Sequence, residues 1–403
     1  MAVVVTRATR ATRATRAANF RWGILAAGVL GFCVPLMAAV LPEDRTDALF
    51  HSYTGGGLTV NGPSILARKQ FGKSVSLWGN YYVDSITSAT IDVVTAASEY
   101  TERRVEKTAG VDYLHDKSTL SLAYTTSEEN DFTANSVHFG VSHSMFGDLT
   151  TVSLGYSRGW DVIGATGDPT FEEKANRQNY RLGLSQVLTK NLLLGLNFET
   201  ITDEGYLNNP YRFTRYLVDS TDPSAGYSLD NEVYPNTHTS HAAAIRALYY
   251  LPYRAAIKGE YGVFMDTWGI NAYHYELGYV HPIKAGWIFD VKYRFYSQTH
   301  ADFYSDLFNR QAEFTYYGRD KELSTFTTQT VGLGASYEFA EHGWWFIDKG
   351  SVNLNYDHIQ LDYKDFRDLS VYKDPVPFAG DAGDEPLYSF SADVLRMFVS
   401  IWY

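Results

Sequence analysis

The chain has 403 residues, a formal net charge of −12 and 31 Tyr, 23 Phe and 8 Trp, at a mean hydropathy of −0.24. So many aromatic residues at so low a hydropathy are unlike a helical membrane protein, and the acidic balance excludes nucleic-acid binding through a basic surface. The composition suits a barrel with aromatic girdles, a polar interior and polar loops, although a soluble, tyrosine-rich β protein would fit it too.

The N-terminus predicts a Sec-type signal peptide. Five arginines precede an apolar stretch from Ile24 to Val40, which ends in Met37-Ala38-Ala39. A positive start, a short apolar core and small residues at its end are typical of such a peptide, and an uncleaved anchor helix is the alternative. Removal of residues 1–39 takes the formal net charge from −12 to about −17 and removes Cys33, the only cysteine. We expect a signal peptide at 1–39, a short periplasmic lead at 40–45 and a transmembrane β-barrel at 46–403.

After residue 45 the sequence alternates between apolar and polar residues in runs of roughly ten, the span of a tilted membrane strand. In 75–83, Val75, Leu77, Tyr81 and Val83 share one face with Gly79, and the same alternation recurs in 150–157, 287–296 and 351–357. A period of two places these sets on opposite faces of a strand. Apolar side chains on one face and Gly, Ser, Asn or charges on the other indicate a lipid-facing exterior and a water-facing lumen.

The connections between these runs alternate in length, which a soluble sandwich has no reason to do. Short ones lie near 71–72, 116–117, 146–148, 190–191, 251–253, 282–286 and 341–343, and longer ones lie near 88–103, 128–133, 162–176, 203–238, 298–325 and 361–387. The connection at 266–269 is the exception. Outer-membrane barrels have tight periplasmic turns and longer outer loops. The count gives about fifteen strands, and 46–53 supplies one more, so we predict an all-β, antiparallel, up-and-down membrane barrel of about sixteen strands (range 14–18) in the bacterial outer membrane.

The last strand carries a specific pattern. Leu395, Met397, Val399, Ile401 and Tyr403 form an unbroken apolar face that ends on a terminal aromatic residue. This pattern resembles the signal that the outer-membrane barrel assembly machinery recognises. We therefore expect that machinery, together with outer-membrane lipid and lipopolysaccharide, among the partners of the chain.

Charged residues occur on the polar face of the predicted strands. They include both signs: Asp112, Arg181, Glu199, Arg246, Lys258, Glu260, Glu276, Asp290, Lys292, Arg294, Asp357 and Arg396. One interpretation is a water-filled lumen that selects ions or solutes, and the other is that opposite charges pair across strands and stabilise the wall. Glycines on the same face, such as Gly332 and Gly334, suggest open space for a pore or a plug.

No residue pattern points to metal, cofactor or enzyme chemistry. The eleven histidines lack the tight ligand spacing of a zinc or copper site, and no Gly-x-Ser-x-Gly motif occurs. We therefore expect no metal, no cofactor and no enzymatic activity, with a barrel-embedded hydrolase as an alternative. Acidic residues in the predicted outer segments suggest Ca²⁺ or lipopolysaccharide-bridging ions, although solvated charge is the simpler interpretation: Asp161, Asp219, Asp222, Asp306, Asp381 and Asp384.

Several segments carry a resemblance to a known family. They are Leu41-Pro42-Glu43-Asp44-Arg45, His51-Ser52-Tyr53-Thr54-Gly55-Gly56-Gly57, Leu207-Asn208-Asn209-Pro210-Tyr211 and Tyr296-Ser297-Gln298-Thr299-His300. Together they resemble an uncharacterised family of proteobacterial outer-membrane β-barrels, a domain-of-unknown-function family. Its members typically have a small lipoprotein, a thioredoxin-like protein and a flavin transferase as gene neighbours. The resemblance implies transport or extracytoplasmic redox or metal traffic, with any redox cofactor on a partner.

Together these features predict a porin-like channel, or a barrel sheath for a partner such as a small lipoprotein or redox protein. The first alternative is a structural or docking scaffold with a closed lumen.

Overall fold

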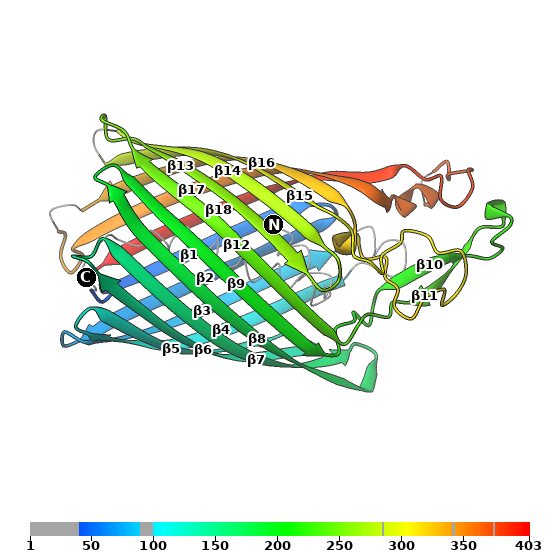
Figure 1. Cartoon of the computed structure of the whole chain (residues 1–403), viewed down its shortest axis with the longest axis horizontal. Helices are drawn as coiled ribbons and strands as arrows, with labels where there is room; N and C mark the ends of the chain where they lie inside the picture. Colours follow the sequence, from blue (N-terminus) through cyan, green and yellow to red (C-terminus); the bar gives the residue numbers. More distant parts are fainter. Residues whose placement is uncertain (1–39, 89–99, 284–285, 341–342, 374) are drawn as a thin grey trace.

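The computed structural model describes residues 40–403 except 89–99, 284–285, 341–342 and 374. The predicted signal peptide therefore lies outside the described residues. Within them, no helix has the length and apolar character needed to cross a membrane. Sixteen strands form one closed antiparallel barrel (Figure 1), which confirms the predicted fold class and strand number.

The barrel strands follow one another around the wall in chain order. They are β1 (Arg45–Gly55), β2 (Leu58–Phe71), β3 (Val75–Ser88), β4 (Tyr100–His115), β5 (Ser118–Glu128), β6 (Phe132–Met145), β7 (Thr150–Ala165), β8 (Asp168–Thr189), β9 (Leu192–Gly205), β12 (Thr237–Tyr250), β13 (Ala256–Asp266), β14 (Asn271–Pro282), β15 (Trp287–Gln298), β16 (Phe326–Phe339), β17 (Lys349–Arg367) and β18 (Leu387–Trp402).

The barrel closes where the first strand meets the last. β1 pairs with β2 on one side and with β18 on the other, from Arg45 opposite Trp402 to Gly55 opposite Ala392. The segment 46–53 thus supplies the sixteenth strand, as its place in the chain suggests. Its alternation is weak in sequence, but pairing on both sides satisfies its backbone and leaves the barrel without an edge.

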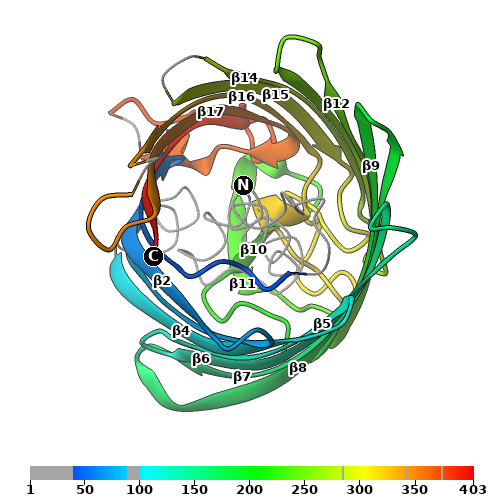
Figure 2. The same ribbon diagram turned by 90° about the vertical axis from the view of Figure 1, so that its left-hand side faces the viewer.

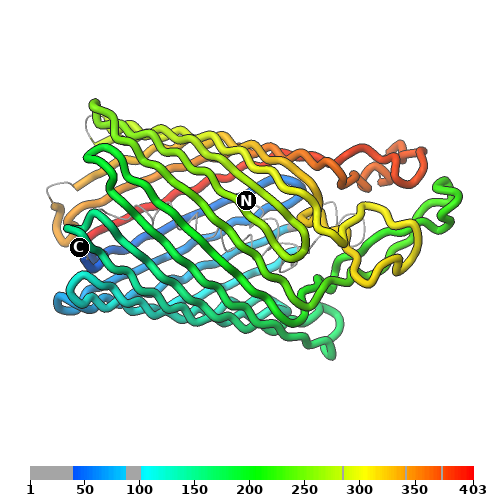
Figure 3. The backbone as a smooth tube through the Cα atoms, in the orientation of Figure 1, coloured from blue at the N-terminus to red at the C-terminus, as the bar shows by residue number. Residues whose placement is uncertain are grey.

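Side chains alternate in direction along each strand, so the outer and inner faces of the wall differ. Most residues at every second position in the middle of the strands are apolar or aromatic and exposed on the outside, as with Leu77, Leu154, Leu277 and Leu333. Residues of the opposite parity face the lumen. In lipid each backbone polar group must be satisfied within the protein, and the continuous antiparallel pairing of strands that lie side by side in Figure 3 achieves this. An apolar outer band of this kind is the surface that a bilayer requires.

The two ends of the barrel differ. At the turn end, where β1 begins and β18 finishes, short turns connect the strands. At the loop end three long connections gather: loop A (206–236), loop B (299–325) and loop C (368–386). Loop A contains a hairpin of β10 (Phe213–Leu217) and β11 (Tyr227–Asn231), and the loops contain the short helices η1 (Pro223–Ala225), η2 (Lys321–Leu323) and η3 (Leu369–Tyr372).

Loops A and B lie over the opening at the loop end of the barrel. Figure 1 places β10 and β11 beyond the loop end, and the end-on view in Figure 2 places them and η2 within the outline of the wall. The two loops pair through their backbones, with Leu217 N–H donating to Phe308 O at 2.9 Å and Tyr317 N–H donating to Val233 O at 2.8 Å. Side chains of the two loops and Trp268 of the β13–β14 connection form a buried cluster, which includes Leu207, Tyr234, Tyr304 and Leu323.

Two of the predicted longer connections are wrong, and the first of them, at 128–133, is only three residues long because β5 ends at Glu128 and β6 begins at Phe132. The segment 162–176 is not a long loop, because β7 continues to Ala165, β8 begins at Asp168, and Gly167 turns the chain at a φ of 94°. Beyond the lipid both faces of a strand meet water, so charged residues such as Glu172 and Lys174 interrupt the alternation without ending the strand. The sequence signal for a membrane strand therefore stops before the strand does.

Candidate functional site: the charged lumen and its outer mouth

The predicted lumen charges share one face of the wall. Lys292, for example, lies between Val291 and Tyr293, whose side chains are exposed on the outside. The same relation holds for Arg181 between Tyr180 and Leu182. By strand parity all twelve side chains named from the sequence belong to the inner face, opposite the apolar band.

Most of these charges are paired across neighbouring strands. Arg246 and Glu260 are opposite one another on β12 and β13, and Arg246 Nε donates to Glu260 Oε2 at 2.7 Å. The other pairs are Arg181 with Glu199 at 3.0 Å, Arg294 with Glu276 at 3.6 Å, and Asp112 with Arg68. Cross-strand ion pairs are thus the contacts that most of these residues make. Among the described residues, Lys258 and Asp290 form no ion pair.

A glycine on β16 leaves room for an ion pair between its two neighbouring strands, β15 and β17. Asp357 on β17 binds Lys292 on β15 at 2.9 Å and Arg396 on β18 at 2.5 Å. Gly332 on β16 lies between Lys292 and Asp357, and a Cβ there would overlap both side chains. The interpretation of Gly332 as open space is therefore wrong, because neighbouring side chains fill it. Gly334 is covered in the same way by Asp290.

Histidines near the loop end join ion-pair groups that the sequence analysis missed. His51 Nε2 is 2.8 Å from Asp84 Oδ1, and Arg104 Nη2 is 2.6 Å from Asp84 Oδ2. His238 Nε2 is 2.9 Å from Asp266 Oδ2. In the part of the chain that the structure describes, no three His, Cys, Asp or Glu side chains are grouped as they would be around a metal ion.

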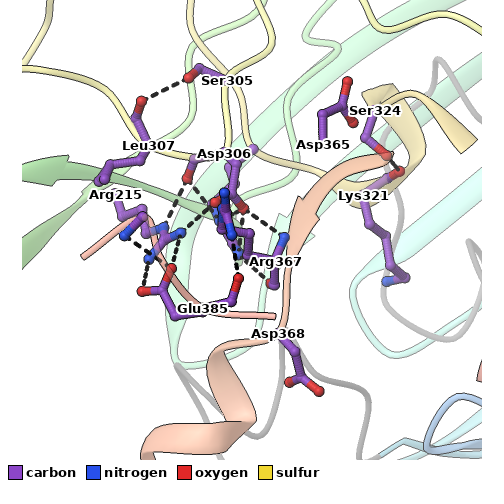
Figure 4. A network of polar contacts seen from close by, with 12 residues as sticks. Arg215, Ser305, Asp306, Leu307, Lys321, Ser324, Asp365, Arg367, Asp368 and Glu385 are labelled. Atoms are coloured by element: carbon purple, nitrogen blue, oxygen red, sulfur yellow. Dashed lines mark hydrogen bonds and ion pairs between the residues drawn. The ribbon is translucent and has the colours of Figure 1, made fainter. Parts of the chain in front are cut away.

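The loops are held together by an arginine that belongs to none of the barrel strands. Arg215 on β10 is 0% exposed, and its guanidinium binds both carboxylate oxygens of Glu385 from loop C, at 2.6 and 3.0 Å. The same guanidinium pairs with the Asp306 carboxylate and donates to Asp306 O at 2.9 Å in loop B. Figure 4 shows Arg215 between Asp306 and Glu385. One buried side chain therefore connects loops A, B and C.

Further contacts extend this group, which we call the latch: Arg215, Asp306, Arg319, Arg367 and Glu385. Arg319 of loop B binds the Asp306 carboxylate at 2.9 Å and donates to Arg367 O at 2.9 Å. The Tyr372 hydroxyl donates to Glu385 at 2.7 Å. Burial alone would raise the pKa of Glu385, but the hydrogen bonds and charge of Arg215 outweigh it and hold the pKa below its usual value.

A second buried carboxylate lies near the latch. Glu232 of loop A accepts a hydrogen bond from the Tyr234 hydroxyl at 2.5 Å and another from Arg319 N–H at 2.7 Å. Burial and the nearby Asp320 carboxylate raise the pKa of Glu232 to about 7, although the hydrogen bonds and the charge of Arg212 act in the other direction. Glu232 therefore changes its charge near neutral pH.

We expect loops A and B to loosen as the pH rises. The pKa of Glu232 is raised above its ordinary value of 4.5, so its stabilising contribution is complete below about pH 4.5 and is lost as the pH rises through about 7. Amide-exchange protection of 206–236 should fall about tenfold between pH 5.5 and pH 8. In Glu232→Gln the protection should not change with pH, and equal protection of the wild-type loop at both values would contradict this assignment.

The acidic outer residues do not gather into one site. Asp306 belongs to the latch, the Asp219 carboxylate accepts hydrogen bonds from Thr221, and Asp222 caps η1 through Ser224 N–H at 3.1 Å. No local sequence signal marks the latch residues, since Arg215 and Glu385 are far apart in the chain. The excess of acidic residues in the loop segments is the only sequence feature related to the latch. It suggests binding of cations from solution rather than ion pairs with arginines of this chain.

Comparisons with known proteins give one family match and several similar solved structures. A family model described as "Protein of unknown function (DUF3570)" matches residues 94–349. No curated protein matches the sequence significantly. Similar solved structures include a bacterial polysaccharide outer membrane secretin (7% identity, 90% of this chain and 99% of that chain, TM-score 0.47), OmpT of Vibrio cholerae (10%, 91% and 100%, 0.42) and OpdK of Pseudomonas aeruginosa (9%, 90% and 99%, 0.41). At these identities and TM-scores the likeness concerns the barrel fold alone.

Proposed function

The chain belongs to the family described as "Protein of unknown function (DUF3570)", and from this premise and its architecture we propose that it is a porin-like channel of the bacterial outer membrane. The outer opening is narrowed by loops A, B and C, so the channel passes small hydrated solutes or ions. The signal peptide predicted at 1–39 would bring the chain across the inner membrane.

The charged inner face of the wall is the observation that supports this proposal. Charged side chains from at least ten strands face the lumen, and transferring so many into a dry interior would cost more than their pairing returns. Side chains such as Arg246 and Lys258 keep part of their surface open inside the wall. A water-filled lumen is the environment in which this arrangement is stable.

A closed scaffold is the second candidate, and the latch favours it. If loops A, B and C seal the outer mouth, the barrel can dock partners without passing solute. Single-channel recording in a planar bilayer separates the two candidates. A channel gives discrete current steps with the wild-type protein, whereas a sealed scaffold stays silent until the latch is broken.

In the other form of the channel proposal, the barrel is a sheath that encloses a partner protein. The turn end would face the periplasm, where a small lipoprotein or a redox protein can reach the lumen. We would add to that side a small lipoprotein of the kind whose gene is typically next to those of family members. It should reduce the current if it enters the barrel, and an unchanged current would argue for a free channel. Incubation of the pure barrel with lipid and peptide substrates tests the hydrolase alternative, for which we expect no turnover.

Lys258 offers a direct test of lumen electrostatics. It is exposed on the inner face of β13 and has no ion pair among the described residues, whereas Arg294 is only 6% exposed and lies against Glu276. Lys258→Glu should raise the cation-over-anion permeability ratio several-fold, because charges on a pore wall set the local ion concentration. Its effect on thermal stability should be small, about 0–1 kcal/mol.

Reversal potentials in a salt gradient measure this ratio. Lys258→Arg keeps the charge and should behave as the wild type does. If Lys258→Glu conducts with unchanged selectivity, the lumen charges are structural only.

A further inference from the structure

Two outward cations near the middle of their strands have no partner among the described residues. Lys107 on β4 and Arg158 on β7 are exposed and share the outward parity of Tyr113 and Leu154. Within the described residues, neither side chain takes part in an ion pair or a hydrogen bond. The lumen arginines Arg68, Arg104, Arg181 and Arg246, by contrast, all have acidic partners.

Both cations lie at the same height on the barrel. Each is eight residues from the turn-end limit of its strand, His115 for β4 and Thr150 for β7. Eight residues of a strand tilted by about 40° rise about 20 Å, which is close to the far edge of an apolar band about 25 Å tall. Lys107 and Arg158 therefore lie where the outer leaflet changes from acyl chains to headgroups.

Aromatic side chains mark this boundary on the same face. The rings of Tyr124 and Trp160 are 6.5 Å apart, and those of Tyr156 and Tyr180 are 5.2 Å apart. The hydroxyl of Tyr180 donates to Gln178 at 2.8 Å, and Gln178 is directly opposite Arg158. Amphipathic rings of this kind gather at membrane–water interfaces. The face formed by β4 to β8 thus has an apolar lower part, an aromatic edge and two cations at that edge.

From this arrangement we propose that the outer face of β4–β8 binds a phosphate-bearing lipid of the outer leaflet, with its acyl chains on the apolar band and its phosphates on Lys107 and Arg158. Three strand spacings and an offset of two residues along the strand separate Lys107 on β4 from Arg158 on β7, which is about 16 Å. That separation suits a headgroup with two phosphates, and arginine and lysine are the side chains that bind phosphate. An outward acid, Glu128, lies opposite Val105, beyond Lys107 toward the loops, and is not paired with Lys107.

Lipid binding to the purified barrel tests this site. Native mass spectrometry with bis-phosphorylated lipid A should show retention by the wild type. The double variant Lys107→Gln/Arg158→Gln should bind it about 30-fold more weakly, since each cation near a charged lipid surface contributes about 1 kcal/mol. Lys364→Gln removes an exposed, outward cation from β17 and serves as the matched control, which should bind as the wild type does.

Two further measurements define which phosphate groups the site recognises. Lipid A with one phosphate should bind less tightly than the bis-phosphorylated form, and millimolar inorganic phosphate should not displace the lipid. Heat-modifiable migration on a gel shows that each variant has folded. Equal retention by the double variant and the wild type would overturn the proposal, as would equal binding of the two lipids or displacement by free phosphate. None of these outcomes depends on whether the barrel conducts.

Discussion

Replacing Arg215 with alanine is expected to release loops A, B and C from one another and to raise the conductance several-fold. Arg215 is the side chain that contacts both Asp306 and Glu385, and it is fully buried. Removing one partner of a buried ion pair leaves an uncompensated charge and typically costs about 3–5 kcal/mol. Because Arg215 belongs to loop A and the latch lies at the loop end of the barrel, the loss should loosen the loops and leave the strands intact.

Limited proteolysis and single-channel recording measure the two consequences. The loops of Arg215→Ala should be cut at protease concentrations that leave the wild type whole, and its current steps should be larger. Arg310→Ala removes an exposed arginine from loop B and provides the control. Wild-type protease resistance and wild-type conductance in Arg215→Ala would show that the latch does not hold the mouth.

Deleting Trp402 and Tyr403 is expected to prevent assembly of the barrel. Trp402 pairs with Arg45 of β1 and Lys349 of β17 at the seam, and its carbonyl accepts a hydrogen bond from Asp348 N–H at 2.8 Å. Tyr403 adds a hydroxyl contact to Thr46 at 3.3 Å. Without these residues the closing seam is shortened, and the terminal aromatic pattern that the assembly machinery would recognise is lost.

Cell fractionation with immunoblotting measures the result. The truncated chain should be exported, remain in the periplasm and be degraded there. Tyr403→Phe keeps the terminal aromatic ring and should assemble normally, which separates the aromatic pattern from the hydroxyl contact. Wild-type amounts of the truncated protein in the outer membrane would contradict the assigned role of the last strand.

The barrel could be predicted from sequence because lipid imposes a local rule. Each membrane strand must place apolar side chains outside at a period of two, so runs such as 75–83 and 351–357 show their structure directly. The pairing of Glu276 with Arg294 also follows from the meander, because neighbouring strands in sequence are neighbours in space. The inner parity of the lumen charges follows from the same rule.

The latch could not be predicted, because no such rule acts beyond the membrane. Arg215 is on a strand of five residues, and its partners Asp306 and Glu385 belong to two other loops. Nothing near any of the three residues in the sequence indicates that they meet. The interpretation of Gly332 as open space is wrong for a related reason. The side chains that fill this space come from β15 and β17 on either side, and the sequence around Gly332 does not show them.

Conductance of the pure wild-type barrel in a planar bilayer tests the channel proposal most directly. A water-filled lumen predicts discrete current steps in the wild type, larger steps in Arg215→Ala and a shift toward cation selectivity in Lys258→Glu. Silence of the folded wild-type barrel would contradict the proposal and leave a closed scaffold, whether or not Arg215→Ala conducts.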